Sequence, residues 1–183
     1  MVLSMKKKNI LAYVGHNHDK NRVKNDFYPT PFNATYELLE KEKLLDPIYE
    51  CACGDGAISK VLIEKGYEVY SSDLIDRGYG EVGVDFLKST DKRFNTIITN
   101  PPFNLSTEFT LKALELSQRY VIFLNKLSFL EGIKRRQTLF NRGHLKTVYV
   151  FTKRLKFGGS GLMAFAWYIF DKQYCGTAEL KWI

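Results

Sequence analysis

FNTIITNPPF, at residues 94–103, is an apolar run that leads directly into two adjacent prolines. The run at 94–99 is typical of a buried strand. Pro101 and Pro102 cannot continue that strand, because proline lacks a backbone N–H and fixes φ. The chain must therefore turn sharply after Asn100, at the carboxyl end of the strand. In an open α/β sheet, ligands bind at that end.

The turn at residues 100–103 combines three useful chemical groups. The side-chain oxygen of Asn100 and the carbonyl of Pro101 can both accept from one –NH2 group, and the ring of Phe103 can stack on a flat base. This combination suits the exocyclic amine of a nucleobase. The alternative interpretation is a proline-rich turn in which Phe103 belongs to the core.

Strands and helices alternate along the rest of the sequence. We expect strands at 47–51, 67–72, 81–84, 94–99, 120–124, 145–151 and 164–170, and helices at 33–45, 57–65, 106–116 and 131–140. This alternation predicts an α/β protein with a doubly wound, mostly parallel sheet of seven strands and helices on both faces. Because the glycine-rich segment at 158–161 can close a hairpin, we expect the last strand to run antiparallel.

The length and composition favour one domain in a reducing compartment. A chain of 183 residues can bury a full core, and we expect a single domain at 26–183 after a basic, partly flexible arm at 1–25. No stretch has the ~20 apolar residues of a membrane helix, and the start of the chain lacks the apolar region of a secretory signal. Three cysteines favour the cytoplasm over a disulfide framework. They lack the spacing typical of zinc ligands, so we expect no metal site.

The net charge of +7 favours a polyanionic partner, and a merely soluble basic protein is the alternative. We expect no membrane partner, and we favour a monomer. Candidate phosphate-binding residues lie in basic clusters of the second half of the chain, at Lys134, Arg135, Arg136, Arg142, Lys153 and Arg154. Each cluster could instead be a solvated helix or loop face.

Candidate ligand-binding residues also follow the first expected strand. This strand ends in Glu50, Cys51, Cys53, Gly54 and Gly56, directly before a helix. Glycines at such a turn allow a positive φ and a close approach of a ligand to the backbone. The alternative is that the glycines only form a tight turn between a strand and a helix.

Acidic residues end the next two expected strands. Asp73, followed by Leu74, stands about 20 positions after the glycine turn, where a carboxylate can bind ribose hydroxyls. Asp85 can accept from an adenine amino group, and Phe86 can pack on the purine face. The alternatives are a helix cap for Asp73, and a turn aspartate beside a core phenylalanine for the other two. Ser59 stands where a full dinucleotide fingerprint has its third glycine, which argues against a nicotinamide-dependent dehydrogenase.

Together these features resemble the motif series of class I S-adenosylmethionine-dependent methyltransferases. The turn at 100–103 resembles motif IV, (D/N/S)-P-P-(Y/F/W), of amino-methyltransferases, chiefly DNA N6-adenine methyltransferases. DFYPTP at 26–31 resembles motif X of these enzymes, and the stretches at 127–132, 153–154 and 166–168 resemble those of small phage and prophage DNA adenine methyltransferases.

The resemblance implies a Rossmann-like class I methyltransferase fold, S-adenosylmethionine as the cofactor, and a bacterial or phage-infected host cytoplasm. It implies cofactor contacts by Tyr28, Thr30, Pro31, Glu50, Cys51, Cys53, Gly54, Gly56, Asp73, Leu74, Asp85, Phe86 and Asn100. It implies a catalytic turn made of Asn100, Pro101, Pro102 and Phe103. Because the chain has no room for a separate target-recognition domain, we expect sequence specificity to be low, or supplied by loops, the arm or a protein partner.

The expected reaction is methyl transfer from S-adenosylmethionine to N6 of adenine in DNA, with the target base flipped out of the duplex. Asn100 Oδ1 and the Pro101 carbonyl would accept from both amine N–H groups and stabilise the positive charge that develops on nitrogen. Three alternatives stay open: an RNA N6-adenine methyltransferase, a protein glutamine methyltransferase, and a non-catalytic nucleic-acid-binding protein of the same fold.

Overall fold

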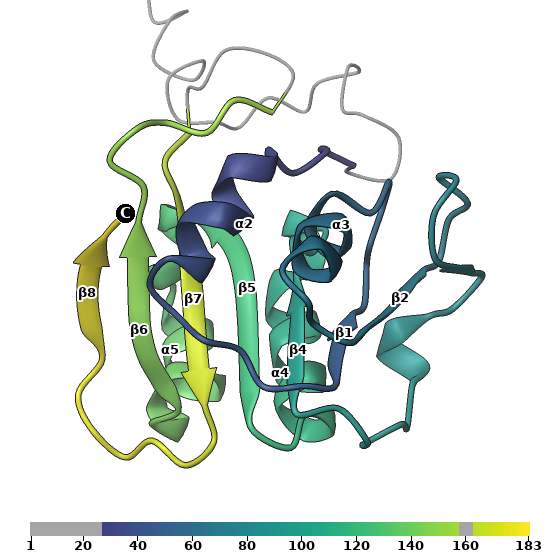
Figure 1. Cartoon of the computed structure of the whole chain (residues 1–183). Coiled ribbons are helices and arrows are strands. Elements are labelled where there is room, and N and C mark those ends of the chain that lie inside the picture. The colour runs from purple at the N-terminus through teal and green to yellow at the C-terminus, as the bar shows by residue number, and fades with distance from the viewer. Residues whose placement is uncertain (1–26, 158–162) are drawn as a thin grey trace, which may run out of the picture.

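A sheet of eight strands runs through the described part of the chain (Figure 1). This computed structural model describes residues 27–157 and 163–183, so the expected arm at 1–25 lies outside the described residues. The strands are β1 (Ile48–Glu50), β2 (Val69–Asp73), β3 (Glu81–Val82), β4 (Thr96–Thr99), β5 (Tyr120–Lys126), β6 (Leu145–Val150), β7 (Phe165–Asp171) and β8 (Glu179–Trp182). Their order across the sheet is β3-β2-β1-β4-β5-β7-β6-β8.

The strand order reverses between β1 and β4. β1 pairs in parallel with both β2 and β4, and β4 pairs in parallel with β5. β7 is antiparallel to both of its neighbours, β5 and β6, while β8 is parallel to β6. The carboxyl ends of β1, β2 and β4 therefore meet at one edge of the sheet, beside the point of reversal where open α/β sheets bind their ligands.

Helices cover both faces of the sheet. The helices are α2 (Phe32–Leu39), α3 (Ala57–Glu64), α4 (Ser106–Leu116) and α5 (Ile133–Thr138), with 3-10 turns η2 (Phe86–Lys88), η3 (Phe103–Leu105), η4 (Leu127–Leu130) and η5 (Phe140–Arg142). In Figure 1, α2 and α3 lie in front of the sheet, and α4 and α5 lie behind it. Among the described residues, none of the helices has the length and apolar character that a membrane span needs.

Each face of the sheet has its own hydrophobic core. Leu38 of α2 and Leu62 of α3 pack with Ile98 on one face, while Phe109 of α4 packs with Ile97 on the other. Ile97 and Ile98 are neighbours on β4 and are both fully buried, because successive side chains of a strand point to opposite faces. The continuous apolar run at 94–99 is thus explained by a central strand with helices on both sides.

The structure confirms the predicted α/β class, the mostly parallel sheet, the helices on both faces and the antiparallel strand near residues 164–170. The predicted number of seven strands is wrong, because β8 adds a further strand at the edge. All four residues of β8 are exposed, so burial leaves no pattern in their sequence. The helix expected at 131–140 is also shorter, since α5 ends at Thr138 and the chain continues as η5.

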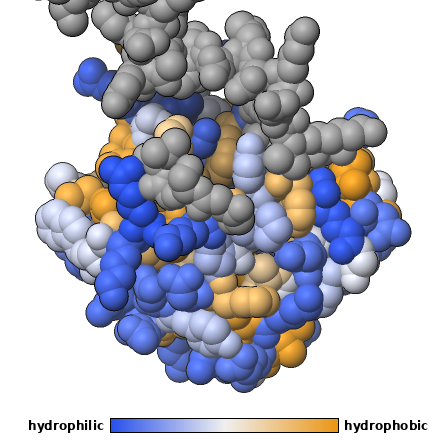
Figure 2. Space-filling view, turned by 90° about the horizontal axis from the view of Figure 1, so that it is seen from above, coloured by the Kyte–Doolittle hydropathy of each residue, from blue (hydrophilic) through white to orange (hydrophobic). Residues whose placement is uncertain are grey.

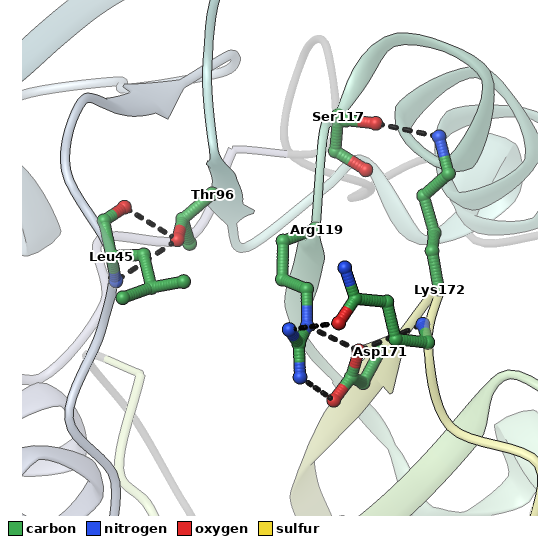
Figure 3. Close-up of polar contacts among 7 residues, drawn as sticks. Leu45, Thr96, Ser117, Arg119, Asp171 and Lys172 are labelled. Carbon is green, nitrogen blue, oxygen red and sulfur yellow. Dashed lines mark hydrogen bonds and ion pairs between the residues drawn. The ribbon is translucent and has the colours of Figure 1, made fainter.

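Side chains hold the opposite end of the sheet, at the amino end of β5. Figure 3 shows Arg119, just before β5, facing Asp171 at the end of β7. Arg119 Nε donates to Asp171 Oδ1 at 2.7 Å, and its Nη2 donates to Oδ2 at 3.0 Å. Lys172 Nζ donates to the carbonyl of Ser117 at 2.7 Å. These contacts fix the segment before β5 to the segment after β7, at the end of the sheet opposite the carboxyl ends of β1, β2 and β4.

Candidate active site

A cavity of about 550 Å³ opens at the carboxyl ends of β1, β2 and β4. Its wall brings together most of the predicted cofactor and catalytic residues, namely Tyr28, Thr30, Glu50, Cys51, Cys53, Gly54, Asp73, Leu74, Asp85, Phe86, Asn100, Pro101 and Pro102. Pro31, Gly56 and Phe103 lie outside this wall. Figure 2 views this end of the molecule from above, where hydrophobic residues lie among hydrophilic ones. A cavity of this size suits a small organic ligand.

The turn after β1 requires both of its glycines. Gly54 has a φ of +56°, and a Cβ at this position would lie 2.4 Å from the ring of Phe27. Gly56, the residue before α3, has a φ of +79°, and a Cβ there would lie 2.5 Å from the ring of Tyr79. The predicted positive φ is therefore confirmed, and the rings that approach this turn belong to the chain itself.

Asp73 holds the glycine turn against the end of β2. Its Oδ2 accepts from the backbone N–H of Gly54 at 2.8 Å, and its Oδ1 accepts from the backbone N–H of Ile75 at 2.9 Å. No helix follows within residues 74–80, so the helix-cap alternative for Asp73 is wrong. Each carboxylate oxygen can accept a second hydrogen bond, so Asp73 can also take a hydroxyl donor from a ligand in the cavity.

Asp85 and Phe86 match the alternative interpretation, a turn aspartate beside a core phenylalanine. Asp85 caps η2 by accepting from the N–H of Leu87 at 3.1 Å, and its Oδ2 lies 3.0 Å from Lys88 Nζ. The hydrogen bond and charge of Lys88 lower the pKa of the Asp85 carboxyl. Phe86 is buried against Tyr49, with ring centroids 5.8 Å apart. Both residues nevertheless belong to the cavity wall.

Glu50 is a buried carboxyl group in the cavity wall. Burial raises its pKa to about 8, although hydrogen bonds from Ser59 act in the opposite direction. The backbone N–H of Ser59 donates to Glu50 Oε2 at 2.8 Å, and the Ser59 hydroxyl donates to the same oxygen. Such a group is neutral near pH 7, and a cation bound beside it would favour its ionised form.

The two cysteines of the turn are buried thiols. Burial, followed by the neighbouring Glu50, holds the pKa of Cys51 well above its usual value, and burial raises the pKa of Cys53 to about 12. These groups therefore stay protonated and form part of the wall rather than reacting as thiolates. Within residues 27–157 and 163–183, no group of histidine, cysteine and acidic side chains has an arrangement that suits a metal ion.

Two hydrogen bonds fix the side-chain amide of Asn100. Its Nδ2 donates to the carbonyl of Tyr28 at 3.2 Å and to the hydroxyl of Thr30 at 3.1 Å. The Tyr28 carbonyl can only accept, so these two bonds determine which end of the amide is the nitrogen. Asn100 Oδ1 is buried and has no hydrogen-bond partner among residues 27–157 and 163–183. A buried acceptor of this kind in a cavity wall is available to a donor from a ligand.

Phe103 lies next to the cavity within a group of aromatic rings. Its ring stacks with that of Tyr28 at a centroid distance of 5.8 Å and an interplanar angle of 21°. Phe165 of β7 packs on it at 5.6 Å, and Lys126 Nζ lies 4.8 Å from the ring centroid. A base that stacks on Phe103 must therefore take the place of one of these neighbours.

The predicted phosphate-binding residues divide into two kinds. Lys134, Arg136, Arg142, Lys153 and Arg154 are exposed. Arg135 instead points into the protein, where it donates to Thr107 Oγ1 at 3.1 Å and to the carbonyls of Phe129 and Glu131 at 2.7 and 2.6 Å. The charged cluster Lys134-Arg135-Arg136 does not reveal from sequence which of its side chains face solvent. The middle residue, Arg135, links η4 to α4 through its hydrogen bonds.

Sequence reasoning missed two residues that close one side of the cavity. The Arg77 guanidinium lies 3.9 Å from the ring centroid of Phe27, and both residues belong to the cavity wall. Phe27 belongs to the DFYPTP segment at 26–31, but the resemblance of that segment assigned no role to it. No sequence pattern marks Arg77, which lies in the loop between β2 and β3.

Among the comparisons with known proteins, only the solved structures bear on the fold. No protein-family model and no curated protein matches the sequence. A Listeria monocytogenes protein assigned as a class I S-adenosylmethionine-dependent methyltransferase superposes with a TM-score of 0.62 and 15% identity, over 94% of this chain and 69% of that protein. The chain therefore has the class I methyltransferase fold expected from its motifs.

Two further solved structures have the same fold with different described roles. A modification subunit assigned to a type I restriction enzyme from Vibrio vulnificus has a TM-score of 0.62 and 13% identity, over 83% of this chain. This chain spans 45% of that subunit, less than half of its length. A Pyrococcus horikoshii protein assigned as an RNA methyltransferase has a TM-score of 0.61 and 20% identity, over 91% of this chain and 99% of that protein.

Proposed function

We propose that this protein transfers a methyl group from S-adenosylmethionine to the exocyclic N6 of adenine in DNA. The observation that carries this proposal is the buried Oδ1 of Asn100, which has no partner in the described part of the chain and whose amide hydrogens bond to Tyr28 and Thr30. An acceptor held in this way, in the turn after β4, suits one N–H of a substrate amine. The methyltransferase fold and the net charge of +7 support the same assignment.

The cavity has suitable groups to hold S-adenosylmethionine. Four carboxyl groups, those of Glu50, Asp55, Asp73 and Asp85, belong to its wall, and this cofactor carries a sulfonium and an ammonium charge. Asp73 would accept from the ribose hydroxyls, and Asp85 would accept from the adenine amino group. The glycine turn at Gly54 allows the ligand to approach the backbone closely. The bound cofactor supplies an electrophilic methyl group.

The residues of the turn would act on the target amine. Asn100 Oδ1 and the Pro101 carbonyl would accept from its two N–H groups, which localises the nitrogen lone pair and stabilises the positive charge that develops there. Asn100 is neutral, so it accepts a hydrogen bond without acting as a strong base. The target base must leave a duplex to reach this turn. Phe103 would stack on the base once Lys126 moves from its place over the ring.

We also propose one methyltransferase domain at 26–183, acting as a monomer in the cytoplasm of a bacterium or of a phage-infected host. The buried free thiols of Cys51 and Cys53 suit a reducing compartment. The V. vulnificus modification subunit is more than twice as long as the region matched by this chain. Target recognition would come from a protein partner, from residues 1–25 or from the exposed basic residues.

Mass spectrometry of nucleosides tests the proposal. The protein is incubated with S-adenosylmethionine and with duplex DNA, single-stranded DNA or total RNA, beside an Asn100→Ala control. N6-methyl-deoxyadenosine made by the wild type and not by the variant is the expected result. N6-methyladenosine in RNA alone would favour the RNA alternative, and no methylated nucleoside in any sample would favour a protein substrate or a binding role. Asn100→Ala should keep nearly normal cofactor affinity, measured by calorimetry.

A further inference from the structure

The segment between η4 and α5 presents apolar side chains to solvent. Ile133 is 80% exposed, the largest value among the large hydrophobic residues of the described chain, and Leu130 is 39% exposed. Gly132 between them has a φ of +109° and nothing within 4 Å of an added Cβ. We call Leu130 and Ile133, which flank the exposed Glu131 and Gly132, the apolar tip. Single exposed hydrophobic residues are common on proteins, so exposure alone does not assign a role to the tip.

The position of the apolar tip is fixed by Arg135. This side chain donates to the carbonyls of Phe129 and Glu131, at 2.7 and 2.6 Å, and to Thr107 Oγ1 at 3.1 Å. Thr107 lies in the first turn of α4, four positions after Phe103. The guanidinium also packs on the buried ring of Phe129, 4.5 Å from its centroid. Arg135 thus ties the tip to the first turn of α4, which follows the turn that carries Asn100 in the chain.

Two exposed cationic residues flank Arg135 in the sequence. Lys134 and Arg136 follow Ile133 on α5, and both are exposed. Within the described residues, neither forms an ion pair with an acidic side chain. Exposed lysine and arginine side chains can bind phosphates, whereas the apolar side chain of Ile133 cannot. Proteins that deform DNA place an apolar side chain between base steps and cations at the adjacent phosphates.

We propose that Ile133, supported by Leu130, is a wedge that enters the DNA duplex and fills the space left by the flipped adenine. This inference rests on the proposed function, because only a base held in a duplex needs to be flipped. Lys134 and Arg136 would bind the phosphates beside the opened step. Arg135 is a positioning residue, since it touches the tip and α4 rather than the DNA.

The test compares the same adenine-containing DNA in duplex and single-stranded form. Ile133→Ser should lower the rate of N6-methyl-deoxyadenosine formation on the duplex by about tenfold and leave the rate on the single strand unchanged. Ile133→Met keeps an apolar side chain of similar size and should retain the duplex rate. Trp182→Ser, at another exposed hydrophobic residue on β8, is the matched control and should have no effect on either substrate.

Three outcomes would overturn the wedge. Equal losses on both DNAs would show that Ile133 acts on the fold or on catalysis, and no loss on the duplex would show that nothing is inserted. A wild-type protein that methylates only single strands has no duplex to open. In each of these cases the wild type still forms methyladenine, whereas a failure of the proposed function itself would leave the wild type inactive on every DNA.

Discussion

Asn100 donates a hydrogen bond of 3.1 Å from its side-chain amide to the hydroxyl of Thr30, 70 positions earlier in the chain. The second amide hydrogen goes to the carbonyl of Tyr28. The segment before α2 therefore sets the orientation of the amide at the end of β4. This contact gives the DFYPTP segment a role that does not depend on touching a cofactor directly.

Thr30→Val should slow methyl transfer, because it removes one acceptor of the Asn100 amide while keeping the shape of the side chain. Losing one hydrogen bond of about 1 kcal/mol corresponds to a rate loss of about five- to tenfold. Single-turnover rates would measure this loss, and calorimetry should show cofactor affinity close to that of the wild type. Thr30→Ser keeps the hydroxyl and should retain the rate. Weaker cofactor binding with an unchanged rate would instead place Thr30 at the cofactor.

Asp73→Ala should weaken binding of S-adenosylhomocysteine, the product form of the cofactor. The change removes an acceptor for ribose hydroxyls and also releases the N–H of Gly54, which holds the glycine turn. Hydrogen bonds to charged groups contribute about 1.5–3 kcal/mol, so we expect a loss of at least about tenfold in affinity, measured by calorimetry.

Asp76→Ala is the matched control for this experiment. Asp76 accepts from the N–H of Gly78 at 2.9 Å, two positions ahead, as Asp73 accepts from Ile75, but Asp76 is not in the cavity wall. Its removal should leave affinity unchanged. If both variants bind equally well, Asp73 has no contact with the cofactor.

The sequence predicted the central part of the fold because burial leaves a pattern there. Ile97 and Ile98 are apolar in succession since β4 is covered on both faces, and α4 was predicted with its observed bounds at 106–116. β8 has no such pattern, since its residues are exposed and its pairing with β6 joins segments about 30 positions apart. Its existence is decided by tertiary contacts that local sequence does not encode.

The residues of the candidate site that follow directly after predicted strands could be predicted from the sequence. Glu50, Asp73 and Asn100 meet in one cavity because carboxyl ends of parallel strands share an edge. The direction of a long side chain was not predictable in the same way. Arg135 carries the same charge as its exposed neighbours, and only packing directs it inward to Thr107.

Asp171→Asn should lower stability at neutral pH. Burial acts to raise the pKa of the Asp171 carboxyl, but hydrogen bonds from Arg119 and from the Gln173 N–H outweigh it and leave this pKa below the ordinary value of 3.8. A lowered pKa in the folded state means that the carboxylate stabilises the fold above about pH 4 and loses this effect as the pH falls through the folded-state pKa.

Urea unfolding at several pH values checks this expectation. The midpoint of Asp171→Asn should be below that of the wild type at pH 7, and the difference should shrink as the pH is lowered toward 3. Arg119→Lys, which keeps the charge but cannot form both hydrogen bonds, should have an intermediate midpoint. A difference that stays constant over this pH range would contradict the ion pair as its cause.

Glu50→Gln should remove a pH dependence of stability that is opposite in sign to the one caused by Asp171. Burial raises the pKa of Glu50 from 4.5 to about 8, so between these values the unfolded chain releases a proton that the folded protein keeps. The stabilising effect is complete below about pH 4.5 and is lost as the pH rises through about 8, with a slope of up to about 1.4 kcal/mol per pH unit. Glutamine resembles the neutral acid and cannot ionise, so the unfolding free energy of the variant should be flatter across this range.

Urea unfolding between pH 5 and 8.5 would compare the wild type, Glu50→Gln and Glu40→Gln. Glu40 is exposed at the end of α2, so Glu40→Gln removes a negative charge without touching the cavity and should retain the wild-type slope. Equal slopes in all three proteins would show that Glu50 is already ionised in the folded state. Because a bound cation favours the ionised form of Glu50, S-adenosylmethionine should flatten the wild-type slope more than that of Glu50→Gln.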